Sequence, residues 1–399
     1  MQIDLQNIKE SSNQFSDYGI MLDPTQRAWI EISGSSIKNN VSRIKESLKE
    51  GCKFMAVVKA DGYGHDAKLV SKYALKGGAD ELGVATLQEG INLRKSGIKV
   101  PILVLGNIYN NDDLIVCFKH DLMPTISTIR DCLLCNNIGK KFHKKFRLHL
   151  KVDTGMSRLG FELNDFVDKF DQVISCEYVL VEGIYSHFAS ADESNALDIN
   201  SFTQVQKRKF QSVLKRINVD NYPFIRNHIA NSAATLLSKE MHFDMVRVGL
   251  SMYGYNPISR SEANIVLQPA LLLKSKISFI RSIDKNVGVS YGSKFISDKK
   301  TKLAVVSIGY ADGISRQLSN KISLICNKKF YPQVGSITMD QLMIDIKNDQ
   351  DIKVGDTVVL LGSDGDLSVS PIDWAEKSSS IAWEVLCGFK NRLPRVQVR

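Results

Sequence analysis

From Arg27 onward, the chain alternates short apolar runs with amphipathic stretches, a pattern typical of strands followed by helices. Stretches with helical spacing, such as 67–76 and 202–217, separate most of the apolar runs. Eight strand–helix units over roughly 200 to 250 residues predict a TIM-type (β/α)8 barrel. A doubly wound sheet is the competing fold, but no G-x-G-x-x-G motif opens a helix. The eight expected strands are Phe54–Lys59, Leu82–Ala85, Ile102–Leu105, Pro124–Ile126, Phe146–Val152, Val181–Phe188, Phe224–Ile229 and Met245–Leu250.

The pattern changes after about Gln268, where short polar turns replace the amphipathic stretches. Glycine-bearing turns at 311–313 and 364–366 fit hairpins or corners of an antiparallel sheet. We therefore divide the chain into an N-terminal extension (1–26), expected to be loosely ordered, a barrel (27–267) and a mostly antiparallel β domain (268–399). The strands expected in the last domain are Leu271–Ile283, Leu303–Tyr310, Ile322–Cys326, Gln341–Ile346 and Thr357–Leu361.

The formal net charge of +9 raises the question of nucleic-acid binding. The densest basic run, Lys140–Arg147, directly precedes an alternating strand, and no helix-turn-helix or RNP-like motif is present. We interpret this run as a solvated loop, or as a favourable field for anionic ligands, and predict no nucleic-acid partner. No apolar run approaches the roughly 18 residues of a membrane helix, and residues 1–25 lack a signal pattern. We therefore expect a cytoplasmic protein without membrane contact.

The seven cysteines are scattered without regular spacing, which predicts reduced thiols rather than disulfides. Cys132 and Cys135 form a C-x-x-C motif, but no second pair completes a zinc site. Their apolar neighbours Leu133, Leu134 and Ile138 favour one side of a core helix over a redox or metal motif, and we predict no bound metal.

One lysine stands where lysines are rare, because Lys59 ends an apolar run and a turn with two glycines follows it. A lysine desolvated at the end of a buried strand loses its proton readily and can attack a carbonyl group. A solvated lysine at a strand end is the alternative. In a barrel, catalytic groups collect at the carboxyl ends of the strands. Polar residues do follow five of the expected strands, namely Lys59, Lys151, Arg158, His187, Ser232 and Arg247.

The loops after the seventh and eighth strands suit an anion. Ser232 stands where a helix would begin, and Gly249 lets the backbone approach a ligand closely. A plain helix cap is the alternative for Ser232. A Schiff-base lysine combined with a phosphate cradle matches the geometry that pyridoxal phosphate requires.

At this point a resemblance is plain. The stretch A-V-V-K-A-D-G-Y-G-H at 56–65 resembles the cofactor-attachment signature of the alanine racemases, pyridoxal-phosphate enzymes of fold type III. The similarity runs from about Arg27 to Arg399, and its motifs occur in family order. They are K-V-D-T-G-M-S-R-L-G at 151–160, G-I-Y-S-H-F-A-S-A-D-E at 183–193, H-I-A-N-S-A-A-T at 228–235, V-R-V-G-L-S-M-Y-G at 246–254, V-S-Y-G at 289–292, I-G-Y-A-D-G at 308–313 and I-T-M-D-Q at 337–341.

The resemblance implies interconversion of L-alanine and D-alanine through an aldimine of the cofactor, supplying D-alanine for peptidoglycan. Lys59 would hold pyridoxal 5'-phosphate and serve as the base on the face used by the D-isomer. Tyr291 would be the base on the opposite face, used by the L-isomer. Two opposed groups are needed because one removes the proton and the other returns it from the far side.

The family positions imply further roles. The phosphate would be held by Tyr63, Ser232, Gly249 and Leu250. Arg247 would face the ring nitrogen of the cofactor, with His187 between Arg247 and Tyr291. The substrate carboxylate would be contacted by Arg158 and by the amide of Met339. Supporting roles fall to Lys151, a position often carbamylated in the family, and to Tyr310 and Asp340 at the entrance. Because Tyr291, Tyr310 and Met339 come from the partner in this family, the resemblance implies a head-to-tail homodimer with composite sites.

Two positions depart from the family pattern. Trp383 stands where a phosphate-contacting tyrosine is usual, and an indole N–H donates but does not accept. Ser336 stands where an arginine commonly precedes the methionine–aspartate pair. The first departure leaves open a racemase of broader or shifted specificity, for example toward serine.

Overall fold

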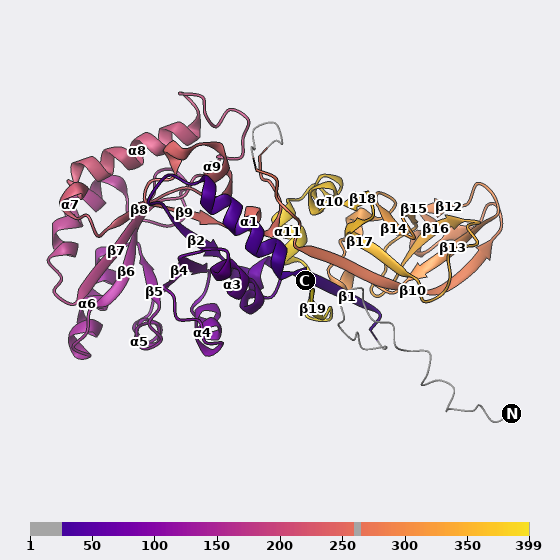
Figure 1. The fold of residues 1–399 in the computed structure, drawn as a ribbon, viewed down its shortest axis with the longest axis horizontal. Helices are drawn as coiled ribbons and strands as arrows, with labels where there is room; N and C mark the ends of the chain where they lie inside the picture. The colour runs from indigo at the N-terminus through magenta and orange to yellow at the C-terminus, as the bar shows by residue number, and fades with distance from the viewer. Residues whose placement is uncertain (1–25, 259–264, 399) are drawn as a thin grey trace. The chain divides into compact units, whose positions relative to one another are not determined.

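The computed structural model describes residues 26–258 and 265–398 and divides into two compact units (Figure 1). One unit, here called the barrel unit, spans Ser35–Pro269. The other, the β unit, joins the segment up to Gly34 with Ala270–Arg399. The expected N-terminal extension, residues 1–26, lies outside the described residues except for Gln26.

Eight parallel strands form the centre of the barrel unit, in the order β8-β7-β6-β5-β4-β3-β2-β9. The barrel strand that is last in sequence, β9, pairs with the one that is first, β2, since Arg247 lies opposite Met55. Toward β8, the amide of Asp244 donates to the carbonyl of Asn227 in that strand at 2.9 Å, and the amide of Arg247 donates to the carbonyl of Ala230 just after it at 3.0 Å. The barrel is thus nearly closed, as predicted. Its strands are β2 (Lys53–Val57), β3 (Glu81–Val84), β4 (Ile102–Asn107), β5 (Met123–Ile126), β6 (Phe146–Lys151), β7 (Val179–Tyr185), β8 (Arg226–His228) and β9 (Met245–Val248).

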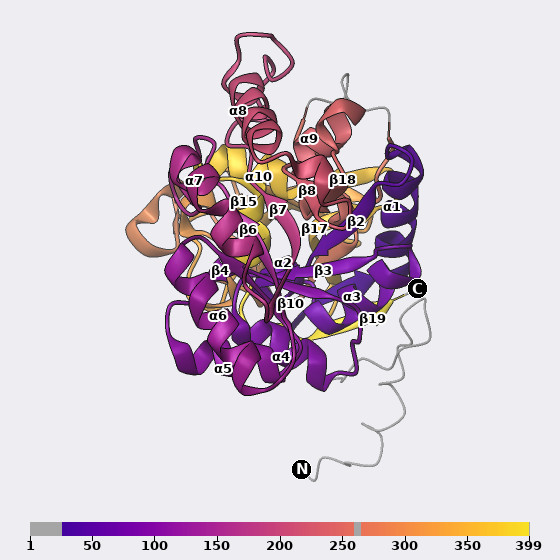
Figure 2. The same ribbon diagram turned by 90° about the vertical axis from the view of Figure 1, so that its left-hand side faces the viewer.

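Helices surround these strands (Figures 1 and 2). Side chains that accept from first-turn amides begin several of them; Asp66 caps α3, and Thr86 forms a capping box with Glu89 at α4. The elements are α1 (Gly34–Ser47), α2 (Lys59–Tyr63), α3 (Ala67–Lys76), α4 (Leu87–Lys95), α5 (Asn111–Lys119), α6 (Ile129–Lys141), α7 (Leu163–Ile174), α8 (Phe202–Arg216) and α9 (Ser232–Leu237), with 3-10 turns η1 (Val219–Asn221), η2 (Lys239–Met241) and η3 (Leu250–Tyr253).

Apolar side chains from five strands meet inside the barrel. The cluster consists of Met55, Leu103, Met123, Tyr185 and Met245, all buried. Alternate residues of every strand point inward, so the interior is filled rather than open. A filled interior leaves the chemistry to the residues that follow the strands.

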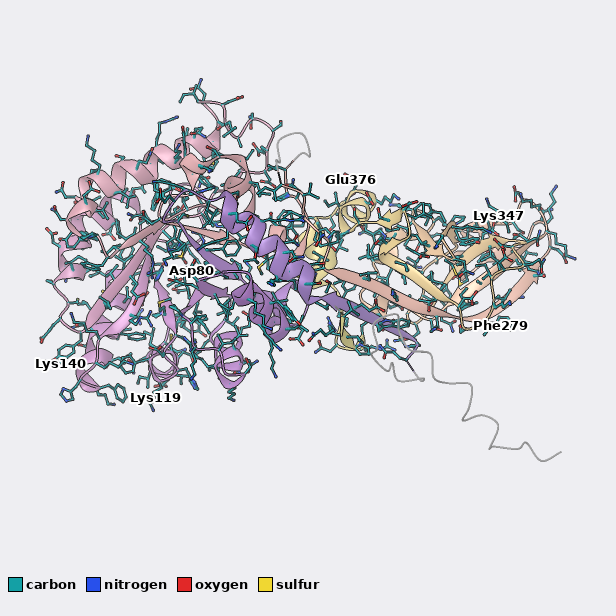
Figure 3. All side chains as sticks on the ribbon, in the orientation of Figure 1. Asp80, Lys119, Lys140, Phe279, Lys347 and Glu376 are labelled. Carbon is teal, nitrogen blue, oxygen red and sulfur yellow. The ribbon has the colours of Figure 1, made fainter. Side chains whose placement is uncertain are left out.

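Both cysteines of the C-x-x-C motif are buried in α6, and burial raises their pKa values. The described residues contain no group of three or more histidine, cysteine or carboxylate side chains able to hold a metal ion. The burial of both cysteines in α6 agrees with the core-helix interpretation. In the basic run, side chains 140–145 are exposed, and Figure 3 shows Lys140 projecting from α6. No helix among the described residues is long and apolar enough to cross a membrane.

The β unit contains a nine-stranded sheet in the order β18-β17-β14-β15-β16-β13-β10-β1-β19. All its pairings are antiparallel except that of β1 with β19. The long strand β10 pairs with β1, β13 and β17, so it organises the unit. A separate two-stranded sheet pairs β11 with β12. The strands of the whole β unit are β1 (Ala28–Ser33), β10 (Leu271–Ile283), β11 (Gly288–Val289), β12 (Phe295–Ile296), β13 (Thr301–Val306), β14 (Ser323–Cys326), β15 (Lys329–Val334), β16 (Leu342–Lys347), β17 (Thr357–Asp364), β18 (Leu367–Val369) and β19 (Arg395–Val398). The helical segments are η4 (Tyr291–Ser293), η5 (Tyr310–Asp312), η6 (Arg316–Leu318), α10 (Pro371–Ser378) and α11 (Ala382–Cys387).

One assignment from the sequence is wrong. The strand Ala28–Ser33, placed with the barrel at 27–267, pairs with β10 and β19 in the sheet of the β unit. An alternating apolar pattern predicts a strand but carries no signal for the sheet it joins. Of the two glycine turns, 364–366 does connect a hairpin, β17–β18, whereas 311–313 lies in and after the 3-10 turn η5.

Candidate active site

Lys59 follows the first barrel strand at the start of a left-handed turn. Although α2 spans Lys59–Tyr63, Ala60, Asp61 and Tyr63 have φ angles of 52°, 53° and 52°. Residues with a Cβ rarely adopt this region, and each costs of order 1–3 kcal/mol unless its surroundings impose it. Here the Glu89 carboxylate accepts from the amide of Ala60 at 2.7 Å, and the Asp61 carboxylate accepts from Ala67 at 2.9 Å. The chain therefore holds a strained turn directly after Lys59.

Three residues from different strand ends build a small polar cradle. The Ser232 hydroxyl oxygen accepts from the Gly249 amide at 3.0 Å, which leaves its own O–H to donate. Asn231, not Ser232, caps α9, since its side chain accepts from the Ala234 amide at 3.1 Å. A Cβ on Gly249 would lie 2.5 Å from the Tyr63 hydroxyl, so only glycine allows Tyr63 this position. Leu250, buried, follows at the start of η3.

Arg247 is buried at the end of β9, and the barrel holds its guanidinium on several sides. Nη1 contacts Nδ1 of His228 at 2.8 Å, and Nη2 donates to the carbonyl of Ser186 at 2.6 Å. Nη2 also contacts Nδ1 of His187 at 3.1 Å. Among the described residues, none accepts a hydrogen bond from Nε. Burial lowers the pKa of Arg247 to about 10, so the group stays charged at neutral pH, and its Nε–H remains available to a ligand.

The other predicted barrel residues gather around this guanidinium. Lys151 is buried with its ammonium 5.4 Å from the centre of the Tyr185 ring. Its pKa falls to about 8, mainly through burial and then through the charges of Arg247 and Arg158. Burial, Arg247 and Lys151 also hold the pKa of His187 well below its usual value. Arg158 is exposed on a loop after β6. Within the described part of the chain, no carboxylate is among the groups that shift the pKa of Arg247, while Lys151 and His187 both feel its charge.

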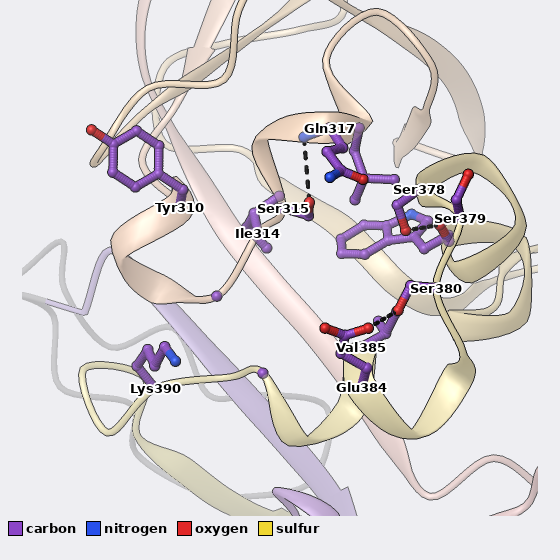
Figure 4. A pocket seen from close by; sticks show the side chains of 14 residues that line it. Tyr310, Ile314, Ser315, Gln317, Ser378, Ser379, Ser380, Glu384, Val385 and Lys390 are labelled. Atoms are coloured by element: carbon purple, nitrogen blue, oxygen red, sulfur yellow. Dashed lines mark hydrogen bonds between the residues drawn. The ribbon is translucent and has the colours of Figure 1, made fainter.

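Four predicted residues lie on the β unit, and all four are exposed. Tyr291 is 72% exposed and Met339 53% exposed. Tyr310 and Met339 are held together, because the amides of Tyr310 and Ala311 donate to the carbonyls of Thr338 and Met339. Asp340 accepts from Arg392 at 2.8 Å. Tyr310 also lines a pocket of about 400 Å³ together with Ser315, Gln317, Ser380, Glu384 and Lys390 (Figure 4).

Comparisons with known proteins show which family the chain resembles. The profile "Alanine racemase, N-terminal domain" matches residues 32–257, and "Alanine racemase, C-terminal domain" matches 270–397. The chain is 52% identical over 377 residues to an alanine racemase of Prochlorococcus marinus, covering 94% of this chain and 97% of that one. The chain belongs to the alanine racemase family. The members are pyridoxal-phosphate-dependent isomerases, and alanine racemisation is the activity that this match supports.

Solved alanine racemases share the whole fold. The structure from Bacillus anthracis with bound L-Ala-P is 34% identical, with a TM-score of 0.84, over 94% of this chain and 95% of that one. The Bartonella henselae alanine racemase with covalently bound pyridoxal phosphate is 26% identical, with a TM-score of 0.83, over 93% of this chain and 99% of the other.

The cradle and guanidinium fit the family's cofactor. A phosphate group needs hydrogen-bond donors and close backbone approach, which the Ser232 O–H, the Tyr63 hydroxyl and Gly249 offer. A pyridine nitrogen needs a donor or a proton, and Arg247 retains an unused N–H. An aldehyde needs an amine, and Lys59 stands at the end of the strand next to β9.

Glu89, His228 and His149 contact predicted site residues or their neighbours but escaped the sequence reasoning. Glu89 shapes the turn after Lys59 from another helix, and its only sequence signal is the T-x-x-E capping pattern at 86–89. His228 and His149 lie on β8 and β6, inside apolar runs, where histidine is rare enough to be noticed. Ser336, one of the departures from the family pattern, donates from its buried hydroxyl to the carbonyl of Tyr291 at 2.8 Å.

Proposed function

We propose that this chain interconverts L-alanine and D-alanine with pyridoxal 5'-phosphate bound to Lys59, using Lys59 and Tyr291 as two opposed bases. The observation that carries the proposal is the buried Arg247 guanidinium on β9. It is held by four hydrogen-bond contacts, and its strand pairs in register with β2, the strand that leads to Lys59. A guanidinium fixed this firmly, with its Nε–H not bonded to the described part of the protein, is suited to a neutral acceptor such as a pyridine nitrogen.

The barrel residues bind and orient the cofactor in this proposal. Tyr63, Ser232, Gly249 and Leu250 hold its phosphate through hydroxyls and close backbone contact. When bound, pyridoxal phosphate withdraws electrons from the substrate amine and so acidifies the α-proton. The Arg247 guanidinium donates to the ring nitrogen without giving up its proton, because its pKa stays near 10. This choice moderates electron withdrawal, which suits an enzyme that only inverts one centre.

Two groups move the proton. Lys59 removes or returns it on the face that serves D-alanine, and the phenol of Tyr291 does so on the face that serves L-alanine. A tyrosine has a pKa near 10 when unperturbed, so it acts as a base only beside positive charge. In this proposal, His187 contacts the Arg247 guanidinium and links its positive charge to Tyr291.

Substrate contacts come from both units in the proposal. The Arg158 guanidinium and the amide of Met339 bind the substrate carboxylate. Tyr310 and Asp340 line the entrance. Lys151 carries a carbamate that orients Arg158: its neutral amine, favoured by a pKa near 8, attacks the carbon of CO2 and releases a proton.

We further propose a head-to-tail homodimer with two composite sites, in which Tyr291, Tyr310 and Met339 reach the site of the partner. The support is their exposure on the β unit, since a catalytic phenol works best where water is excluded. The enzyme would supply D-alanine for peptidoglycan in the cytoplasm, without nucleic-acid or membrane partners.

The test is conversion of L-alanine to D-alanine by the purified chain, with and without added pyridoxal phosphate. We expect cofactor-dependent production of D-alanine, and its absence after reconstitution would refute the proposal. Trp383 on α11 favours a second candidate, a racemase of shifted specificity, because its bulk and donor chemistry differ from those of tyrosine. Serine assayed in parallel separates the two, since an equal or faster rate on serine would favour the second.

A further inference from the structure

A chain of buried histidines extends inward from Arg247. Nη1 of Arg247 contacts Nδ1 of His228 at 2.8 Å, and Nε2 of His228 contacts Nδ1 of His149 at 2.9 Å. Both imidazoles have no exposed surface. The chain runs from the end of β9 through β8 to the middle of β6, and so links the site to the barrel interior.

The chemistry of the first donor fixes the direction of every hydrogen bond. An arginine side chain only donates, so Nδ1 of His228 must accept and its proton must sit on Nε2. That proton can then be accepted only by Nδ1 of His149, which puts the His149 proton on its own Nε2. That Nε2 is buried and has no hydrogen-bond partner among the described residues. His149 thus accepts from His228 through Nδ1, while its Nε2–H donor stays without an acceptor in the described part of the chain.

The surroundings keep both rings neutral and in place. Burial, followed by the charge of Arg226, lowers the pKa of His149 to about 3, and burial and Arg247 lower that of His228 well below its usual value. Tyr185 stacks on His228 with ring centres 4.9 Å apart and planes 4° apart. A Cβ on Gly183 would lie 2.5 Å from Nδ1 of His149, so the glycine is what admits the ring.

We propose that His149 is a positioning residue for the racemisation: by accepting from His228, it fixes the tautomer and orientation of the ring that holds one end of Arg247. The guanidinium is then held with its Nε–H available to the cofactor nitrogen. This inference rests on the proposed function, since it assigns His149 a role through Arg247 and not a contact with substrate. A buried donor left without a partner is the cost of that arrangement.

The test compares His149→Leu with His149→Asn, two side chains of similar shape. Asparagine keeps an acceptor near the position of Nδ1, and leucine does not. We expect His149→Leu to lower kcat about 10-fold or more with little change in KM for alanine, as for other residues that orient a ligand-contacting group. It should also shift the absorbance of the bound cofactor. His149→Asn should recover most of both. Equal losses in the two variants, or an unchanged spectrum in His149→Leu, would overturn the proposal.

A measurement without cofactor separates this inference from the proposed function. In the ¹⁵N-labelled cofactor-free chain, NMR should show His228 protonated at Nε2 and His149 accepting at Nδ1, whether or not the chain racemises alanine. The opposite tautomers would overturn the inference and leave the racemase proposal standing. Conversely, if the tautomers are as expected but the chain fails the L-alanine assay, only the racemase proposal is refuted.

Gly183→Ala displaces the His149 ring without changing it, and so serves where His149→Leu fails to fold. We expect the same loss of kcat and the same spectral shift as in His149→Leu. In a His149→Ala background, where no ring remains to be displaced, the added methyl should cost clearly less. An equal cost in both backgrounds would show that the methyl acts through the Arg226 carbonyl, 3.0 Å from the same position, and would contradict the role of His149.

Discussion

The two units carry their candidate residues in opposite ways. In the barrel unit, Arg247 and Ser232 are buried and their hydrogen bonds are already made. In the β unit, Tyr291 and Met339 are exposed. The barrel residues therefore need only a ligand, whereas the β residues need something to cover them. This difference indicates that cofactor binding, by the barrel unit, and proton transfer by Tyr291, on the β unit, can be disrupted separately. The first two variants below each disrupt one of them.

The largest effect is expected on the barrel side, from Lys59→Ala. Without its amine the chain cannot attach the cofactor covalently and loses one base, so racemisation should fall by at least ~10³-fold. Borohydride reduction followed by mass spectrometry should find the cofactor adduct on the wild-type chain and none on the variant. Lys68→Ala, an exposed lysine of α3, is the control and should keep both the adduct and the activity. An adduct that survives in Lys59→Ala would place the attachment elsewhere.

On the β side, Tyr291→Phe should lower racemisation by ~10²–10³-fold, the usual contribution of one acid–base group. Exchange of the α-proton with solvent should fall far more for L-alanine than for D-alanine, while the cofactor stays attached. Tyr109→Phe is a matched control, since Tyr109 of the barrel unit is 73% exposed and Tyr291 is 72% exposed. Symmetric loss of exchange for the two isomers would contradict the two-base assignment.

Mixing the two inactive variants tests whether the halves come from different chains. A heterodimer of Lys59→Ala with Tyr291→Phe has one site with both bases if each site is composite, and statistical mixing should restore about a quarter of wild-type activity. Sites built from a single chain would stay inactive in every combination. The dimer content of each mixture is measured in parallel by light scattering, so that failure to associate is recognised.

The sequence predicted the barrel well because its signal is local. Each of the eight apolar runs overlaps an observed strand, and α3 begins and ends where the spacing put it, at 67–76. What escaped prediction depends on contacts distant in sequence. The first strand pairs with β10, about 240 residues later in the chain, and β19 adds to it from the C-terminus. No local pattern encodes such a pairing.

The candidate site divides in the same way. Lys59 and the cradle follow from strand ends and glycines, which the sequence displays. The role of Glu89 depends on a left-handed turn at Ala60, and that of His149 on a hydrogen bond to His228 across 79 positions. Residues that act through another side chain leave no motif of their own.

The two units also differ in their aromatic residues. All three tryptophans (Trp29, Trp374 and Trp383) lie in the β unit, whereas all seven histidines lie in the barrel unit.

That division predicts where acid acts first. Burial lowers the pKa of His149 to about 3 and holds that of His228 well below its usual value of about 6.5. The unfolded chain thus binds protons that the folded barrel does not, so the stabilisation is complete above pH 6.5 and is lost as pH falls toward 3. Each such histidine steepens the loss by up to ~1.4 kcal/mol per pH unit.

Urea unfolding between pH 6.5 and 5 checks this expectation. Helical circular dichroism, which comes mainly from the barrel helices, should show the decline in stability, and tryptophan fluorescence reports the β unit separately. His149→Asn should make the slope shallower. A free energy of unfolding that stays constant over this range, or an unchanged slope in His149→Asn, would show that these histidines are charged or exposed in the folded chain.

The smallest effect concerns Trp383, one of the two positions where the β unit departs from the family pattern. Tyrosine there would restore a hydroxyl that donates and accepts, and one added hydrogen bond of ~1 kcal/mol should tighten cofactor binding about 5-fold. Trp383→Phe is the matched comparison, since it relieves the same bulk without a hydroxyl and should not tighten binding. Both smaller rings should raise the rate on serine relative to alanine, because the pocket gains room. Cofactor titrations that give the same affinity for the tyrosine and phenylalanine variants would mean that ring size, and not the hydroxyl, governs this position.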